Sequence, residues 1–187
     1  MSGKITIVTG GARSGKSSYA ECLARTSTHP VAYLATAIPF DGGMRDRIKK
    51  HQESRTKEWT TIEGYKDLHK SIENITKNHG TILLDCVTIM ITNLMLDEEK
   101  DCWDTMSYEQ INKIEGDIQK QFRQLMKCIR EHNLWLIAVT NEVGMGIVPE
   151  NRLARIFRDI AGRVNQIIAK EADEVIFTVS GIPMKIK

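Results

Sequence analysis

Short apolar runs alternate along this chain with longer segments in which apolar residues recur every three or four positions. The runs that are rich in β-branched residues cover residues 5–9, 31–35, 81–84, 134–140 and 174–179, and this composition is typical of buried strands. The segments between them are long enough for crossover helices, so we expect the strands to run parallel. The pattern therefore predicts an α/β fold, a mainly parallel sheet flanked by helices.

Two segments, residues 108–131 and 150–171, have the clearest helical periodicity, with apolar residues on one face and charged or amide residues on the other. We interpret both as helices that cover the sheet. A shorter helix is expected over residues 17–25. Residues 181–187 contain Pro183 and are expected to turn back as a short edge strand, the usual place for proline in a sheet.

The loop after the first predicted strand matches G-x-x-x-x-G-K-[ST], the pattern of a phosphate-binding P-loop. Small residues let successive backbone N–H groups surround a polyphosphate, and a helix that begins beside them adds its positive end. The lysine supplies a mobile cation and the last serine a hydroxyl ligand for Mg²⁺. The loop residues are Gly10, Gly11, Ala12, Arg13, Ser14, Gly15, Lys16 and Ser17. They predict a nucleotide-binding fold of the P-loop NTPase (RecA-like) class, and leave open kinase, GTPase or ATPase chemistry.

In parallel sheets, ligands bind beyond the carboxyl ends of the strands, so residues at these ends are candidates for function. The run 81–84 leads directly into Asp85, which fits a Walker B acid that holds Mg²⁺ directly or through water. Capping of the next helix is the alternative role for Asp85. Glu142 follows the fourth strand, and three roles stay open for it: metal ligand, base or cap.

Composition narrows the class of protein. The chain has 187 residues, with 26 Lys and Arg against 24 Asp and Glu, and no shift in composition, so we expect one domain over residues 1–187. The scattered charge gives no reason to expect nucleic acid as a partner. Four cysteines without metal-ligand spacing indicate reduced thiols and a cytoplasmic protein. The longest apolar stretch, residues 134–139, is too short to span a membrane.

Residues 44–55 can form a helix that carries a second group of functional candidates. Helical spacing puts Arg47 and Arg55 on the same face as His51. The guanidiniums suit a polyphosphate and disfavour the imidazolium form, which leaves His51 available as a nucleophile near neutral pH. From spacing alone, the alternative is a solvated basic helix with an incidental histidine. Lys50 is a rival nucleophile, but it must first lose its proton.

Taken together, these motifs make the chain resemble the bifunctional adenosylcobinamide kinase and adenosylcobinamide-phosphate guanylyltransferase family of cobalamin biosynthesis. The resemblance covers nearly the whole chain, and the ordered set of motifs is far more specific than the P-loop. The matching segments are residues 9–17, 33–36, 47–51, 84–88, 92–94, 139–149, 158–166 and 180–181.

The resemblance implies phosphorylation of the aminopropanol hydroxyl of adenosylcobinamide, followed by transfer of GMP from GTP to that phosphate through a guanylylated histidine. His51 matches this histidine, although some members have two adjacent histidines where this chain has Lys50 and His51. It also implies a small homo-oligomer, expected to be a trimer. Lys16, Ser17 and Asp85 would organise charge and Mg²⁺, and GTP or ATP could serve the kinase step. Expected guanine or ribose contacts are Ala35, Thr36, Ala37, Gln52, Glu53, Ser54, Arg55 and Glu63.

Three other functions compete with this interpretation. A GTPase switch would normally show an Asn-Lys-x-Asp element and an Asp-x-x-Gly element after the P-loop, and the sequence has neither. A simple small-molecule kinase would transfer the γ-phosphoryl group without covalent GMP on the enzyme. A guanylyltransferase without kinase activity would form the adduct but not phosphorylate cobinamide.

Overall fold

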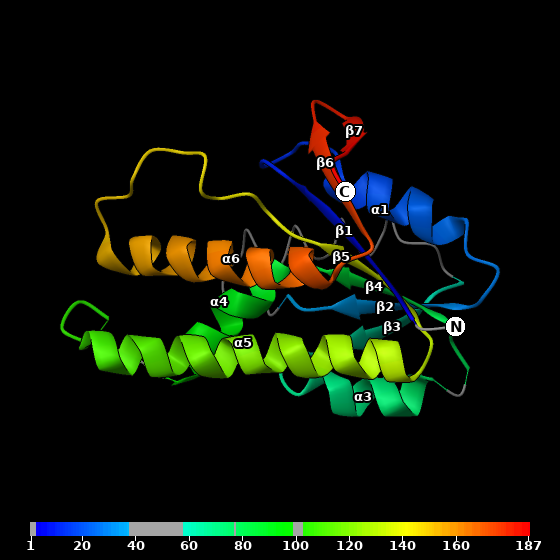
Figure 1. Ribbon diagram of the computed structural model, residues 1–187, viewed down its shortest axis with the longest axis horizontal. Coiled ribbons are helices and arrows are strands. Elements are labelled where there is room, and N and C mark those ends of the chain that lie inside the picture. The colour runs from blue at the N-terminus through cyan, green and yellow to red at the C-terminus, as the bar shows by residue number, and fades with distance from the viewer. Residues whose placement is uncertain (1–2, 38–57, 77, 99–102) are drawn as a thin grey trace.

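The computed structural model describes residues 3–37, 58–76, 78–98 and 103–187. These residues form a seven-stranded sheet in the order β3-β2-β4-β5-β1-β6-β7, with helices on both faces (Figure 1). The strands are β1 (Lys4–Gly10), β2 (Val31–Ala35), β3 (Thr60–Glu63), β4 (Thr81–Asp85), β5 (Trp135–Val139), β6 (Glu174–Val179) and β7 (Ile182–Lys185). The helices are α1 (Lys16–Arg25), α3 (Leu68–Ile75), α4 (Val87–Glu98), α5 (Tyr108–Glu131) and α6 (Arg152–Glu171).

The sheet confirms the predicted α/β class and its mainly parallel character. Each pair of neighbouring strands is parallel except β6 with β7. Strands β1, β2 and β4 are buried along nearly their whole length, which explains why their sequences are continuous apolar runs. The C-terminal edge strand is also confirmed: β7 pairs antiparallel with β6 and contains Pro183.

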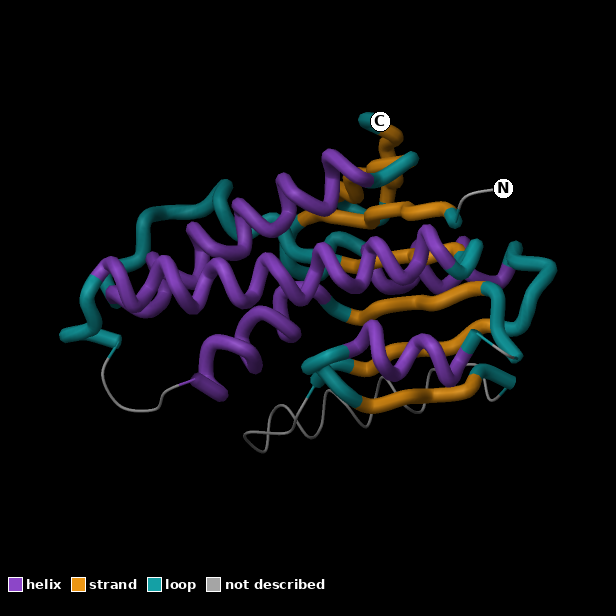
Figure 2. Tube along the Cα trace, turned by 60° about the horizontal axis from the view of Figure 1, so that its bottom comes forward, coloured by secondary structure: helices purple, strands orange, loops and turns teal. Residues whose placement is uncertain are grey.

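Helices α3, α4, α5 and α6 cover one face of the sheet, and α1 packs on the other (Figures 1 and 2). Alternate strand residues serve the two cores: Leu84 faces the larger helical layer, whereas Leu83 faces the side of α1. The long amphipathic helix α5 matches the predicted bounds, and Ser107 and Gln110 form a capping box at its start. Its apolar stripe includes Phe122, which is 1% exposed. Burial of such a ring contributes about 1.5–3 kcal/mol.

Three elements lacked a clear sequence signal. Strand β3 is short and mostly exposed at the sheet edge, so no apolar run marks it. Helix α4 is buried on most sides, with an apolar sequence that has no polar stripe, and such a segment cannot be recognised by its periodicity. Helix α3 is short. Helix α6 begins at Arg152 after an Asn151 cap, two residues later than predicted.

Candidate functional site

The P-loop connects the carboxyl end of β1 to the start of α1 at the middle of the sheet (Figure 1). Arg13 and Gly15 both have a left-handed backbone, with φ of 56° and 92°, so the chain curls before the helix begins. A hollow of about 840 Å³ lies at this turn. We call it the P-loop hollow, and its lining is Ala12, Arg13, Ser14, Gly15, Lys16, Ser17, Ser18, Asn141, Glu142 and Val143. The first turn of α1 thus borders a space suited to a phosphate chain.

The turn between β6 and β7 supports the P-loop from behind. The hydroxyls of Ser14 and Thr178 lie 2.9 Å apart, and the Gly181 N–H donates to the Ser14 carbonyl at 3.0 Å. A Cβ on Gly15 would lie 3.1 Å from the Gly181 Cα, so glycine at position 15 meets both a backbone and a packing requirement. Segments more than 160 residues apart therefore hold the loop in shape.

Lys16 is the buried cation of the site. Its side chain donates from Nζ to the Gly11 carbonyl at 2.6 Å, and the residue is only 7% exposed. Burial lowers the pKa of the ammonium, whereas the nearby Cys86 and Asp85 raise it. A polyanion in the hollow would compensate this poorly solvated charge much better than one carbonyl does.

Asp85 ends β4, where it pairs in register with Ala35 on β2 and Val139 on β5. Its Oδ2 accepts a hydrogen bond of 2.7 Å from the Tyr33 hydroxyl, and Tyr33 itself is 1% exposed. The carboxylate is therefore fixed by a buried donor. Ser17 is half-buried and lines the P-loop hollow.

The end of β2 lies in the same layer as Asp85. Ala35 is buried and pairs with both Asp85 and Glu63, and Glu63 is exposed at the end of the edge strand β3. The Thr36 hydroxyl donates to the Cys86 carbonyl at 2.9 Å and accepts from the Cys86 N–H at 2.8 Å. Thr36 thus links the end of β2 to the end of β4 through two hydrogen bonds. The next residue, Ala37, is half-buried. Burial raises the pKa of the Cys86 thiol to about 11, which keeps it protonated.

Five of the predicted site residues lie outside the described residues, as does the helix predicted over residues 44–55. They are His51, Gln52, Glu53, Ser54 and Arg55. The described part of the site therefore consists of the P-loop, the ends of β2, β3 and β4, and the segment after β5.

The fold brings two further residues to this site. Glu142 lines the P-loop hollow, its N–H donates to the Gly10 carbonyl at 3.0 Å, and its Oε1 accepts from the Gly144 N–H at 3.0 Å. Its position after β5 was the signal from which the sequence indicated a metal ligand, a base or a cap at this residue. Tyr33 had a weaker signal: a tyrosine inside a fully buried strand needs a partner for its hydroxyl, and Asp85 is that partner.

Comparisons with known proteins point to one family. The profile of the family described as cobinamide kinase / cobinamide phosphate guanyltransferase matches residues 6–186. The bifunctional adenosylcobalamin biosynthesis protein CobU of Escherichia coli K12 is 46% identical over 185 residues, which cover 97% of this chain and 98% of that protein. The corresponding protein CobP of Pseudomonas aeruginosa is 36% identical, covering 97% of this chain and 96% of its own.

The fold has a more distant counterpart in a solved structure. A KaiC-like protein from Pyrococcus horikoshii OT3 superposes with a TM-score of 0.50 at 13% identity, covering 94% of this chain and 71% of that protein. This likeness supports the P-loop NTPase fold alone. Among the described residues, no helix is long and apolar enough to cross a membrane.

Proposed function

The chain belongs to the cobinamide kinase / cobinamide phosphate guanyltransferase family, and on this premise we propose that the P-loop hollow holds the nucleotide for both transfers. The acceptor of the first is adenosylcobinamide, and the acceptor of the second is the phosphate formed on it. The observation that carries the proposal is the buried Lys16 ammonium at the P-loop, close enough to Asp85 for the carboxylate to affect its pKa. This pair supplies the charge that phosphoryl transfer requires.

In the kinase step, the acceptor hydroxyl oxygen forms a bond to the γ-phosphorus, and the bond from that phosphorus to the β,γ-bridging oxygen breaks. A nucleoside diphosphate leaves and a base takes up the hydroxyl proton. The P-loop N–H groups and Lys16 stabilise the charge that develops on the phosphate oxygens. GTP and ATP both fit this chemistry.

In the guanylyl step, a ring nitrogen of His51 bonds to the α-phosphorus of GTP, and pyrophosphate leaves. An oxygen of cobinamide phosphate then bonds to that phosphorus, the N–P bond breaks, and adenosylcobinamide-GDP is released. Lys16 stabilises the departing pyrophosphate. Ala35, Thr36, Ala37, Gln52, Glu53, Ser54, Arg55 and Glu63 stay proposals for contacts to guanine or ribose.

The side chains at the hollow fit a magnesium ion that is held largely by the nucleotide. Mg²⁺ usually binds proteins through one or two side chains, together with phosphate oxygens and water. Ser17, which lines the hollow, and Asp85, at the end of β4, are the pair that we propose. The described residues hold no cluster of three or more His, Cys, Asp or Glu that could hold a metal. Bound Mg²⁺ would neutralise phosphate charge during transfer.

Replacement of Tyr33 by Phe tests whether the fixed Asp85 carboxylate organises the metal. Removal of the 2.7 Å hydrogen bond frees the carboxylate to rotate, so we expect the Mg²⁺ concentration for half-maximal kinase rate to rise about 10-fold. This factor corresponds to about 1.4 kcal/mol, the scale of a hydrogen bond to a charged group. Titration of kinase rate against Mg²⁺ measures it. An unchanged Mg²⁺ dependence would contradict the metal role of Asp85.

The covalent step is tested by mass spectrometry of the intact protein and its peptides after incubation with GTP and Mg²⁺ without acceptor. Acid must be avoided because phosphoramidates hydrolyse in it. We expect a GMP adduct on the peptide that contains His51. If nucleotide-binding protein forms no adduct, either alone or with cobalamin, whose aminopropanol hydroxyl is already esterified, the protein is a simple kinase and the His51 mechanism is wrong.

We further propose that the enzyme works in the cytoplasm as a small homo-oligomer. The four cysteines of the sequence, which lack metal-ligand spacing, support a reducing compartment. The oligomer, expected to be a trimer, rests on the family resemblance, and sedimentation velocity of the purified protein would test it.

A further inference from the structure

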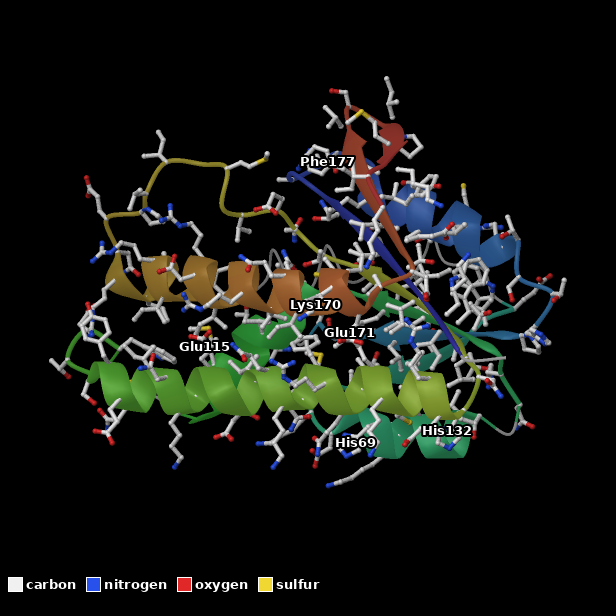
Figure 3. The ribbon with its side chains drawn as sticks, viewed as in Figure 1. His69, Glu115, His132, Lys170, Glu171 and Phe177 are labelled. Carbon is white, nitrogen blue, oxygen red and sulfur yellow. The ribbon has the colours of Figure 1, made fainter. Side chains whose placement is uncertain are left out.

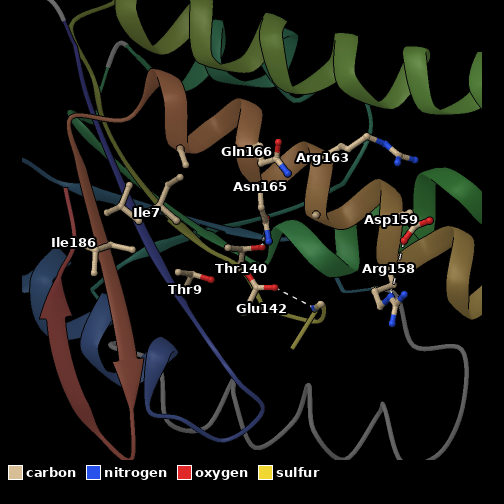
Figure 4. A pocket seen from close by; sticks show the side chains of 14 residues that line it. Ile7, Thr9, Thr140, Glu142, Arg158, Asp159, Arg163, Asn165, Gln166 and Ile186 are labelled. Carbon is tan, nitrogen blue, oxygen red and sulfur yellow. Dashed lines mark hydrogen bonds and ion pairs between the residues drawn. The ribbon is translucent and has the colours of Figure 1, made fainter. Parts of the chain in front are cut away.

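A second hollow, whose lining Figure 4 shows, shares Glu142 with the P-loop hollow. We call it the α6 groove, because one wall is helix α6, from Arg158 to Ala169, and the other comes from β1, β6 and the C-terminal residues after β7. Its volume is about 660 Å³, within the range of small-molecule sites. The two hollows therefore meet at Glu142.

The lining of the α6 groove changes in character along its length. Ile7 and Val175, which are 3% and 6% exposed, give it an apolar floor together with Ile186. Gln166 places an exposed amide along α6. The neighbouring Asn165 amide is already engaged, because its Oδ1 accepts from the Thr140 hydroxyl at 2.7 Å and its Nδ2 donates to the Asn141 carbonyl at 3.2 Å (Figure 4). A ligand with an apolar body and polar edges would satisfy both kinds of surface.

Two arginines of α6 border the groove, and they differ in their partners. The Arg163 guanidinium donates two hydrogen bonds to the Glu115 carboxylate of α5, from Nε to Oε1 at 2.5 Å and from Nη2 to Oε2 at 2.8 Å. Glu115 lies between the two helices (Figure 3). Arg158 instead lies 3.9 Å from the Asp159 carboxylate, which is too long for a hydrogen bond. No described residue accepts a hydrogen bond from Arg158, so its guanidinium N–H groups can donate to an anion.

We propose that the α6 groove binds the corrinoid acceptor and that the Glu142 carboxylate contacts its reacting hydroxyl. This inference rests on the proposed function. A cobinamide has an apolar macrocycle, a rim of primary amides and an arm that ends in an alcohol. The apolar floor, the Gln166 amide and the carboxylate at the junction match these three features, and Arg158 suits the phosphate that the first reaction adds.

The same geometry assigns the base of the kinase step. Oδ2 of Asp85 is held by Tyr33 on the side of β2 and β4, and Asp85 does not line the groove. Glu142 lines both hollows, and the bond from its N–H to Gly10 fixes it beside the P-loop. As the hydroxyl oxygen bonds to the γ-phosphorus, its proton passes to the Glu142 carboxylate.

Gly162 provides a direct test, since it lines the groove and a Cβ there would meet nothing within 4 Å. The Gly162→Leu variant would place a side chain in the groove without disturbing the fold. Gly116 is its matched control, because it also lies within a helix, is exposed, and has nothing within 4 Å of a Cβ. Leucine favours helix over glycine by roughly 0.5–1 kcal/mol, so neither replacement should unfold its helix.

We would measure cobinamide binding by equilibrium dialysis, following the absorbance of the corrin ring. Gly162→Leu is expected to weaken binding at least about 10-fold, the effect of losing about 1.4 kcal/mol of contact, with GTP affinity and GMP adduct formation unchanged. Gly116→Leu should bind like wild type. Equal cobinamide affinity in the two variants, or a changed oligomeric state of Gly162→Leu without a change in affinity, would overturn the assignment of the groove.

Glu142→Gln is the second variant and keeps the test independent of groove shape. We expect its kinase kcat to fall about 10²-fold, the lower range for loss of a general base, with the acceptor KM and the GMP adduct retained. A kcat near wild type would overturn the assignment of the base. The readouts separate the two proposals: a missing adduct in wild-type protein refutes the His51 mechanism, whereas cobinamide dialysis still decides the groove.

Discussion

Lys16→Ala is expected to lower both the kinase rate and the guanylyl-transfer rate by about 10³-fold or more, the scale of losing a cation that stabilises a phosphoryl-transfer transition state. The reason is that, in the proposed function, the same ammonium would face the γ-phosphoryl group in one reaction and the departing pyrophosphate in the other. Steady-state assays with cobinamide and with cobinamide phosphate, each at saturating nucleotide, measure the two losses separately. Lys16→Met should lose as much, because it keeps the aliphatic stem and removes the charge.

A thermal melt distinguishes this functional loss from misfolding. The Lys16 ammonium is buried beside one carbonyl, and burial of a charge costs stability unless it is well paired. We therefore expect Lys16→Ala to unfold, without nucleotide, at the same temperature as wild type or above it. Lys113→Ala, on the exposed face of α5, is the control and should keep both activities. Retention of either activity in Lys16→Ala would mean that this reaction does not use the P-loop.

The parts of the site that could be predicted from sequence are those encoded by neighbouring residues. The glycine pattern from Gly10 to Ser17 combines a strand end, a left-handed turn and a helix start in eight positions, so its backbone requirements can be read locally. Asp85 could be predicted in the same way, because a buried strand that ends in one carboxylate places that carboxylate at the carboxyl ends of the strands, where ligands bind. The long stripes of α5 and α6 were equally clear.

The parts that escaped depend on contacts between distant segments. The sequence around Thr36 does not indicate that its hydroxyl forms hydrogen bonds with the Cys86 backbone. In the same way, the sequence around Ser14 does not indicate its hydrogen bonds to Thr178 and Gly181. The α6 groove is of this kind too, because Ile7 and Gln166 become neighbours only when α6 packs across the sheet. Register and helix packing, which a single sequence does not state, decide these contacts.

His51→Ala is expected to abolish the GMP adduct and to lower guanylyl transfer by at least about 10³-fold, while kinase activity stays within about 10-fold of wild type. Removal of a nucleophile from a covalent mechanism can cost on the order of 10⁶-fold, and the detection limit of the assay sets the smaller figure. The kinase step needs only an acceptor hydroxyl, a base and the P-loop charges, none of which His51 provides. Measurement of both activities on one protein preparation gives the ratio directly.

The neighbouring lysine decides whether the histidine is the nucleophile. Lys50→Ala should keep both the adduct and guanylyl transfer, since an ammonium with a pKa near 10.4 is almost fully protonated at neutral pH. An adduct that persists in His51→Ala and disappears in Lys50→Ala would make lysine the nucleophile. Equal loss of both reactions in folded His51→Ala protein would instead mean that the histidine serves the shared nucleotide site. In the proposed mechanism, the kinase step and the guanylyl step both use the phosphate groups and Lys16, but only the guanylyl step passes through a covalent intermediate. A selective loss of guanylyl transfer is therefore the one result that agrees with two reactions at one P-loop.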